Sequence, residues 1–259
     1  MPAAWLSRIA DGINVSVAFA TRIPLANVGL TSGADVVRAS WALPIVGVLV
    51  GGLGALTYWT AHLLGLTAAS CAALTLAATL AATGCLHEDG LADTADGFGA
   101  GASRERKLEI MHDSRIGAYG SCALIVSILL RWSAVASLGD ALHVTAALIA
   151  AHVAARGTLP AFMRLVPRAR RDGLSAGAGA PTRATASIAA CLGLLALGLT
   201  LGTVPALVAV SLIGLAGVLM GWLCIRQIGG QTGDVLGALE QVCEILILLT
   251  ASAQSRAAI

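Results

Sequence analysis

Long apolar stretches of about twenty residues recur along the sequence and restrict what it can fold into. About twenty consecutive apolar residues are what an α-helix needs to cross a lipid bilayer. Only 12% of the residues are charged, about half the share typical of soluble domains. The pattern predicts an all-α, polytopic membrane helical bundle with about seven transmembrane helices, forming one transmembrane domain over residues 1–259. The predicted spans are 41–64, 67–86, 118–138, 141–161, 186–202, 204–224 and 235–253.

The segment 3–20 has a different pattern from the spans. Apolar residues recur in it at roughly helical spacing, with Arg8, Asp11 and Asn14 between them. This pattern is typical of an amphipathic helix that lies at the membrane interface. A polar linker is expected to lead from it to Arg38.

Lysine and arginine are unevenly distributed between the two sides of the membrane that this topology defines. With the N-terminus in the cytoplasm, thirteen of the sixteen basic residues fall in cytoplasmic segments. An excess of Lys and Arg marks the cytoplasmic loops of membrane proteins. The charged cytoplasmic loops are therefore predicted at 87–117, 163–185 and 225–234. Arg131, near the outer end of its span, is expected to extend its side chain to the outer interface.

The segment 87–120 carries seven of the fourteen acidic residues. Asp89, Asp93 and Asp96 are four and three residues apart, so on a helix they share one face. Three carboxylates on one face repel one another unless a divalent cation lies between them. Oxygen ligands in an open geometry suit Mg²⁺, which keeps waters and bridges to substrate phosphates. A solvated acidic helix end is the alternative, but no Lys or Arg occurs from His87 to Ser103.

Small and charged residues follow the acidic cluster. Gly97 and Gly99 either let the backbone approach a phosphate closely or end the helix. A short helix is predicted over 104–112, with Ser103 as its N-cap. Beyond this helix, Asp113 is a candidate metal ligand and Arg115 a candidate phosphate partner, with a capping and interface role as the alternative.

The last predicted span also contains ionisable residues. Asp234 is expected to cap its N-terminus, and Glu244 lies about 15 Å further along the helix. A carboxylate inside the membrane is a functional hypothesis by default. His152 and Arg156, one turn apart on the fourth span, are its expected partners. A buried structural ion pair is the alternative.

Together, these residues combine a metal-binding cluster with nearby arginines. Diphosphate chemistry needs both, since a metal and arginines neutralise the charge on the transferring phosphoryl group and stabilise the leaving phosphate. The sequence contains no evident Ser/His/Asp arrangement, Walker loop or nucleic-acid-binding pattern, so no nucleic-acid partner is expected.

The run EDGLADTADG at 88–97, together with LEIMHDSRIGAYG at 108–120, resembles the cobalamin synthase family, the adenosylcobinamide-GDP ribazoletransferases. FATRIP at 19–24 and GGQTGDVLGA at 229–238 are similar to that family's terminal motifs. The resemblance covers nearly the whole chain. It implies a Mg²⁺-dependent reaction of adenosylcobinamide-GDP with α-ribazole or its 5′-phosphate, giving adenosylcobalamin or its 5′-phosphate and GMP. It also implies a location in the bacterial cell inner membrane, with the active site on the cytoplasmic face.

Under this resemblance the polar residues have expected roles. The expected metal ligands are Glu88, Asp89, Asp93, Asp96 and Asp234. The expected catalytic residues are Asp96, Asp113 and Arg115, with Asp113 or a carboxylate of the first cluster as the general base. Contacts to the substrates are expected from Arg22, Arg115, Arg156, Gly97, Gly99, Gly230 and Gly233.

Two other functions compete with this hypothesis. Residues 93–97 fit the start of the DxxDG pattern of CDP-alcohol phosphotransferases, but Ala100-Gly101 stands where that pattern requires Ala-Arg. A divalent-cation transporter would place its ligands near the bilayer midplane, whereas the main acidic cluster is predicted at the membrane's edge. The expected partners are the two small substrates and the lipid bilayer. The sequence leaves open a homo-oligomer or contacts with other cobalamin-assembly enzymes.

Overall fold

The computed structural model describes residues 2–25, 32–170 and 179–257, and these residues form helices and no strand. Residues 26–31 of the predicted linker and 171–178 of the predicted basic loop lie outside the description. The helices are α1 (Pro2–Ala20), α2 (Gly33–Ala39), η1 (Ser40–Ala42), α3 (Leu43–Leu63), α4 (Ala68–Thr83), α5 (Leu86–Ala100), α6 (Arg104–Ile110), α7 (Ala118–Leu138), α8 (Ala141–Leu165), α9 (Arg183–Leu201), α10 (Thr203–Ile228) and α11 (Gly233–Ala257).

Six helical segments within the described residues are long and apolar enough to cross a membrane, and α4 with α5 makes a seventh if this bent pair counts as one span. The all-α, polytopic membrane fold is therefore confirmed. The expected linker before Arg38 is wrong where it is described, because Ser32 and Asp35 form a capping box that starts α2. The helix then continues through η1 into α3.

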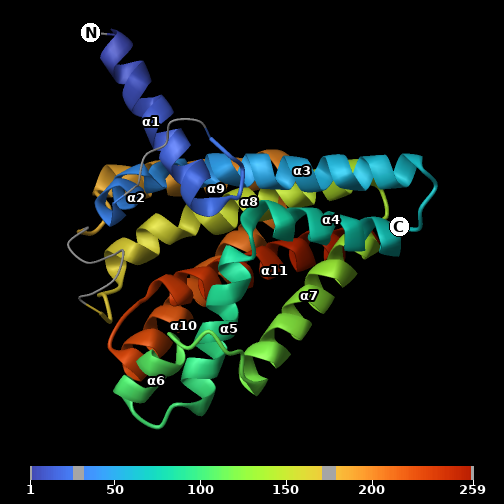
Figure 1. Ribbon diagram of the computed structural model, residues 1–259. Helices are drawn as coiled ribbons and strands as arrows, with labels where there is room; N and C mark the ends of the chain where they lie inside the picture. Colours follow the sequence, from blue (N-terminus) through green and yellow to red (C-terminus); the bar gives the residue numbers. More distant parts are fainter. Residues whose placement is uncertain (1, 26–31, 171–178, 258–259) are drawn as a thin grey trace.

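The second predicted span differs most from the structure. The chain turns by 89° between α4 and α5. Gly84 and Cys85, with φ angles of 62° and 59°, both have the left-handed conformation that ends a helix. The backbone N–H of Arg22 donates to the carbonyl of Ala82 (2.7 Å) and holds the N-terminal segment beside this turn. The acidic helix α5 therefore crosses the direction of α3 and α8 instead of extending α4 (Figure 1).

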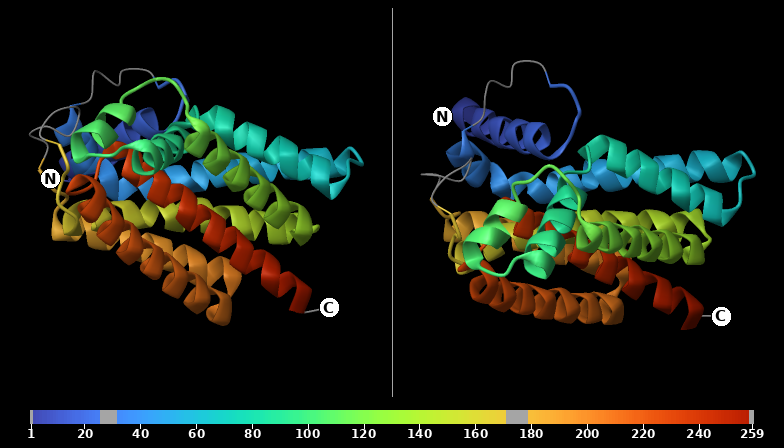
Figure 2. Two further views of the ribbon diagram at one scale, coloured as in Figure 1. Left: turned by 90° about the horizontal axis from the view of Figure 1, so that it is seen from below. Right: turned by 60° about the horizontal axis from the view of Figure 1, so that its bottom comes forward.

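Helix α8 is the most buried of the candidate spans and packs against α3, α9 and α11. Glycines allow these backbones to approach closely. A Cβ atom on Gly47 of α3 would lie 2.3 Å from the carbonyl oxygen of His152, and one on Gly157 of α8 would lie 2.8 Å from that of Ala189. Small residues have this role at many helix contacts in membranes. Helices α9 and α10 run along one edge of the bundle, and the two termini lie at its opposite ends (Figure 2).

Candidate active site

A cavity of about 550 Å³ lies where α4, α5, α7 and the start of α11 meet. Its acidic wall brings together four of the five metal ligands predicted from the sequence, and Asp113 also faces the cavity. The segment between α6 and α7 closes one side with His112 and Ser114. Residues more than a hundred positions apart thus form one site. The four predicted ligands are Glu88, Asp89, Asp93 and Asp234.

Two glycines explain why the acidic residues of α5 and α11 converge. A Cβ atom on Gly90 would lie 2.7 Å from the carbonyl oxygen of Asp234, and one on Gly237 would lie 3.2 Å from the Cα atom of His87. The first distance leaves no room for a side chain, and the second is tighter than an ordinary van der Waals contact. The two helices cross at these glycines with their backbones in contact, and this crossing places Asp89 and Asp93 beside Asp234.

The acidic wall is electrostatically crowded. Asp93 is half-buried and lies within electrostatic reach of Asp89, Asp96 and Asp234. Glu88 is buried, with one oxygen bound to Arg131 (2.9 Å) and the other, Oε2, without a hydrogen-bond partner. Several carboxylates around one cavity, including an unpartnered buried oxygen, fit the hard-oxygen ligand set that Mg²⁺ prefers.

Asp96 has a different environment from the other predicted ligands. Its two oxygens accept hydrogen bonds from the backbone N–H groups of Gly117 (2.7 Å) and Gly120 (2.9 Å). It is buried and does not line the cavity. A carboxylate at this position satisfies free N–H groups in the first turn of α7 and is favoured by the helix dipole. Asp96 therefore fixes the start of α7 against α5.

Asp113 and Arg115 form an exposed ion pair at the mouth of the cavity, with an N–O distance of 2.6 Å. The hydrogen bonds and charge of Arg115 lower the pKa of Asp113 to about 2. A carboxylate with so low a pKa is a weak proton acceptor at neutral pH. This pairing favours a carboxylate of the first cluster over Asp113 as the general base.

The described part of the basic loop 163–185 lies against α6 and the segment before α11. Ala169 and Gln231 share a backbone hydrogen bond (3.0 Å), which ties the loop to the segment before α11. Arg170 contacts His112 and donates to the carbonyl of Leu108. Both Arg170 and His112 lie within electrostatic reach of Asp234. They add positive charge or hydrogen-bonding groups beside the acidic wall, and the sequence did not single them out.

The other predicted substrate-contacting residues lie around the cavity without lining it. Arg22 is exposed beside the turn between α4 and α5. Gly97 and Gly99 pack closely, since Cβ atoms there would lie 2.5 Å from the side chains of Met111 and Tyr119. Gly230 has a φ of 156° and packs against the carbonyl of Pro167.

At the start of α11, a Cβ on Gly233 would meet nothing within 4 Å. The predicted substrate contact at Gly233 stays a prediction. The expected N-cap at Asp234 is wrong, because the hydroxyl of Thr232 accepts from Val235 N–H (3.3 Å) instead.

A buried network of charged residues lies behind the cavity, inside the helical bundle. The prediction that Arg131 reaches the outer interface is wrong, because its side chain is 1% exposed. It binds Glu88 at 2.9 Å and Glu244 at 3.2 Å. The turn between α4 and α5 directs Glu88 into the bundle, and this gives Arg131 an internal partner.

Arg156 and His152 complete this network. Arg156, a predicted substrate contact, binds Glu240 at 2.6 Å and is 1% exposed. His152 binds Glu244 at 3.0 Å, as expected from the sequence. His152, Glu240 and Glu244 lie close enough together to hold a metal ion. Arginines already neutralise both carboxylates, so the ion pairs account for this cluster.

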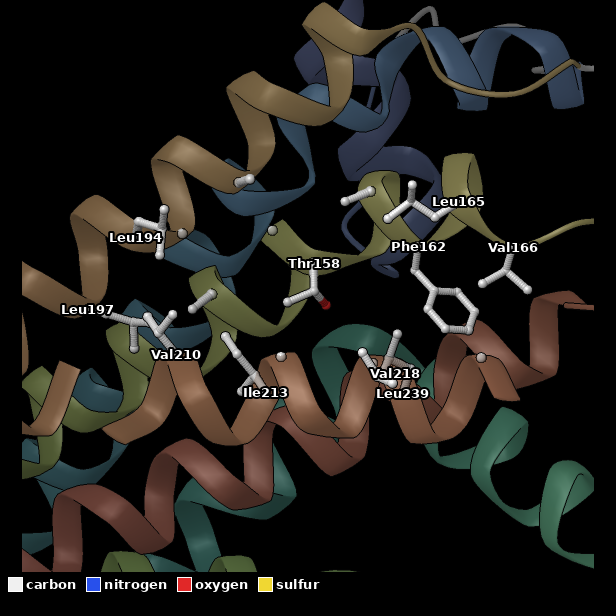
Figure 3. Close-up of a pocket in the computed structure, with 18 of the residues that line it drawn as sticks. Thr158, Phe162, Leu165, Val166, Leu194, Leu197, Val210, Ile213, Val218 and Leu239 are labelled. Atoms are coloured by element: carbon white, nitrogen blue, oxygen red, sulfur yellow. The ribbon is translucent and has the colours of Figure 1, made fainter. Parts of the chain in front are cut away.

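A second cavity, of about 480 Å³, lies between α8, α9 and α10 (Figure 3). Leu194, Leu197, Ile213 and Phe162 are among its lining residues, and no ionisable side chain lines it. This cavity has no group to bind a metal or a phosphate. The acidic cavity, which gathers carboxylates from α5 and α11, is the candidate active site.

The fold and the acidic cavity define a multi-pass membrane protein with a carboxylate-rich site between its helices. The family model described as cobalamin-5-phosphate synthase matches residues 12–252, and the chain belongs to this family. It is an enzyme, a transferase of cobalamin biosynthesis that acts in assembly of the nucleotide loop.

Curated relatives are similar to the chain over almost its full length. The adenosylcobinamide-GDP ribazoletransferase of Bradyrhizobium diazoefficiens is 56% identical over 95% of this chain and 94% of its own. That of Mesorhizobium japonicum is 52% identical over the same shares. That of Azorhizobium caulinodans is 45% identical over 94% of this chain and 96% of its own. No solved structure matches the chain.

Proposed function

We propose that the protein transfers the adenosylcobinamide-phosphate group from adenosylcobinamide-GDP to α-ribazole or its 5′-phosphate, with Mg²⁺ as cofactor. The products are adenosylcobalamin, or its 5′-phosphate, and GMP. The convergence of Asp89, Asp93 and Asp234 on one cavity carries this proposal. The names of the relatives, adenosylcobinamide-GDP ribazoletransferases, support the choice of substrates.

The carboxylates of the cavity would hold the metal. Asp89, Asp93 and Asp234 line it from two helices, and the free oxygen of Glu88 completes the set. Bound Mg²⁺ would neutralise charge on the diphosphate and on the leaving GMP. The predicted ligand Asp96 is proposed instead as a positioning residue, because both its oxygens hold the start of α7.

The remaining polar groups are arranged for a displacement at phosphorus. A ribose hydroxyl of the acceptor attacks the phosphorus that bears the corrinoid side chain, and the bond to the GMP oxygen breaks. Asp93, half-buried among the other carboxylates, is proposed to take the hydroxyl proton. Arg170 and His112 are placed to bind phosphate oxygens at the cytoplasmic mouth, and Arg115 can join them by leaving Asp113.

The distribution of basic residues supports the proposed side of the membrane. Thirteen of the sixteen basic residues fall in segments that the topology places with the cavity mouth. The positive-inside rule therefore supports the proposed cytoplasmic side for the active site, and the membrane that we propose is the cell inner membrane.

An assay of GMP release tests the proposal. Purified full-length protein in nanodiscs should release GMP only with both substrates and Mg²⁺, and chelation with EDTA should abolish release. Uptake of a divalent cation into vesicles without GMP production would instead support the transporter hypothesis. Transfer from a CDP-alcohol would support the CDP-alcohol phosphotransferase hypothesis.

A further inference from the structure

The acidic cavity has a second wall that its metal chemistry does not use. Leu80 of α4 and Leu124 and Ile128 of α7 line the side facing the membrane-spanning part of the bundle. Ile128 lies ten residues into α7, about 15 Å along the helix. One cavity thus joins a carboxylate wall to a deep apolar wall.

The apolar wall belongs to the cavity and is distinct from the general lipid-facing surface of α7. Leu124 and Ile128 are one turn apart and share a face, which points toward α4 and α5. Ile125 and Leu129, on another face of the same turns, are 58% and 54% exposed and do not line the cavity. The helix therefore offers a matched pair of apolar faces, only one of which can touch a bound substrate.

The cavity's size limits what can enter it. A volume of about 550 Å³ is in the range that holds one small organic ligand. A nucleoside is of this size, whereas the corrinoid macrocycle with its side chains is several times larger. The candidates for the apolar wall are therefore the guanosine of the donor and the aromatic base of the acceptor.

Chemistry separates these two candidates. Guanine has several hydrogen-bond donors and acceptors along its edge, and burying them against leucine and isoleucine would leave them unpaired, which is unfavourable. Ribazole carries a dimethylbenzimidazole, whose outer ring is a hydrocarbon with two methyl groups. That edge gains free energy on the same wall.

Resting on the function proposed above, we infer that Leu80, Leu124 and Ile128 bind the benzimidazole of α-ribazole and select for an apolar base. The base lies toward the membrane side, and the ribose lies toward Asp89 and Asp93. The apolar wall would thus orient the attacking hydroxyl of the acceptor.

Acceptor kinetics test this inference. Leu124→Ala and Ile128→Ala, in full-length protein in nanodiscs, should each raise KM for α-ribazole about tenfold or more, with KM for adenosylcobinamide-GDP unchanged. Leu129→Ala on the lipid-facing side of α7 is the matched control and should behave as wild type. Wild type should also prefer α-ribazole to the unmethylated benzimidazole riboside, and both variants should lose part of this preference.

Other outcomes would overturn the inference. A rise in KM for the donor alone would show that the apolar wall binds guanosine. Unchanged kinetics in both variants would show that the wall contacts lipid chains and binds neither substrate. Ile128 is 39% exposed, so Ile128→Ala should fold even if Leu124→Ala does not.

Direct binding of α-ribazole, followed by the fluorescence of its base without donor or Mg²⁺, separates this inference from the proposed function. Binding that Leu124→Ala weakens would support the apolar wall even if wild type released no GMP. GMP release with unweakened binding in both variants would support the function and reject the wall.

Discussion

Asp93 and Asp96 are three residues apart on one helix, yet their different surroundings assign them different roles. Asp93→Asn should lower GMP release by about 100-fold or more without lowering the melting temperature, because Asp93 lies among like charges and the change removes one of them. Asp96→Asn should lower both activity and melting temperature. An amide can accept only one of the two N–H groups that Asp96 now accepts, and losing such a cap costs about 1 kcal/mol.

Thermal unfolding and GMP release, measured on the same preparations, distinguish the two roles. If both variants lost activity at unchanged melting temperature, Asp96 would be assigned to the metal site, as the sequence predicted.

Helical spacing correctly predicted a shared acidic helix, but it could not tell which carboxylate the neighbouring helix would use. Asp96 meets the start of α7 because α5 turns across the bundle. The same turn explains why Arg131 was misplaced, since its partner Glu88 was expected outside the membrane. An arginine within a span is itself a signal of an internal partner, and this signal outweighs the residue's closeness to a helix end.

Among the secondary-structure elements, the crossing of α5 and α11 determines the geometry of the site. Gly90→Ala would place a methyl group 2.7 Å from the Asp234 carbonyl and push the helices apart. Separation of the carboxylates by about 1 Å should lower GMP release by about 100-fold. Gly52→Ala on α3 is the control, because a Cβ there meets nothing within 4 Å. Full activity in Gly90→Ala would show that this contact does not position the ligands.

The buried network joins α5, α7 and α11 through Arg131. Arg131→Met should destabilise the protein by about 3–5 kcal/mol, because it leaves Glu88 and Glu244 buried without their shared cation. Adding Glu244→Gln to this variant should restore part of the lost stability by removing one unpaired charge. Thermal unfolding of the single and double variants measures both effects, and a double variant less stable than Arg131→Met would count against this account of the network.

Six of the seven predicted spans, the short helix after Ser103 and the pairing of His152 with Glu244 could be predicted from apolar length, capping residues and helical spacing. The 89° turn could not. Gly84 alone indicates the end of a helix, but the direction of α5 depends on Gly90 and Gly237 at its crossing with α11. Contacts between residues so distant in sequence leave no local pattern.

For the molecule as a whole, the topology depends on whether α4 and α5 together carry the chain across the membrane. Helix α4 has sixteen residues, about 24 Å at 1.5 Å per residue, which is shorter than a typical hydrocarbon core of about 30 Å. The acidic cavity begins at its end, so a polar region lies closer to the bilayer centre there. If α4 and α5 cross the membrane, Arg38 and the segment 104–115 lie on the same side of it. If α4 and α5 form a re-entrant pair, these two segments lie on opposite sides of the membrane.

The positive-inside rule favours a membrane crossing by α4 and α5, because only this topology places the basic segments on one side of the membrane. Single cysteine substitutions, labelled with a membrane-impermeant thiol reagent, test this topology. Labelling of the wild-type protein gives the background from its native cysteines. Arg38→Cys and Ser114→Cys should both label in inside-out vesicles, and Asp140→Cys, between α7 and α8, should label only in right-side-out vesicles. Labelling of Arg38→Cys and Ser114→Cys from opposite sides would make α4 and α5 a re-entrant pair and would move the cavity mouth away from the cytoplasm.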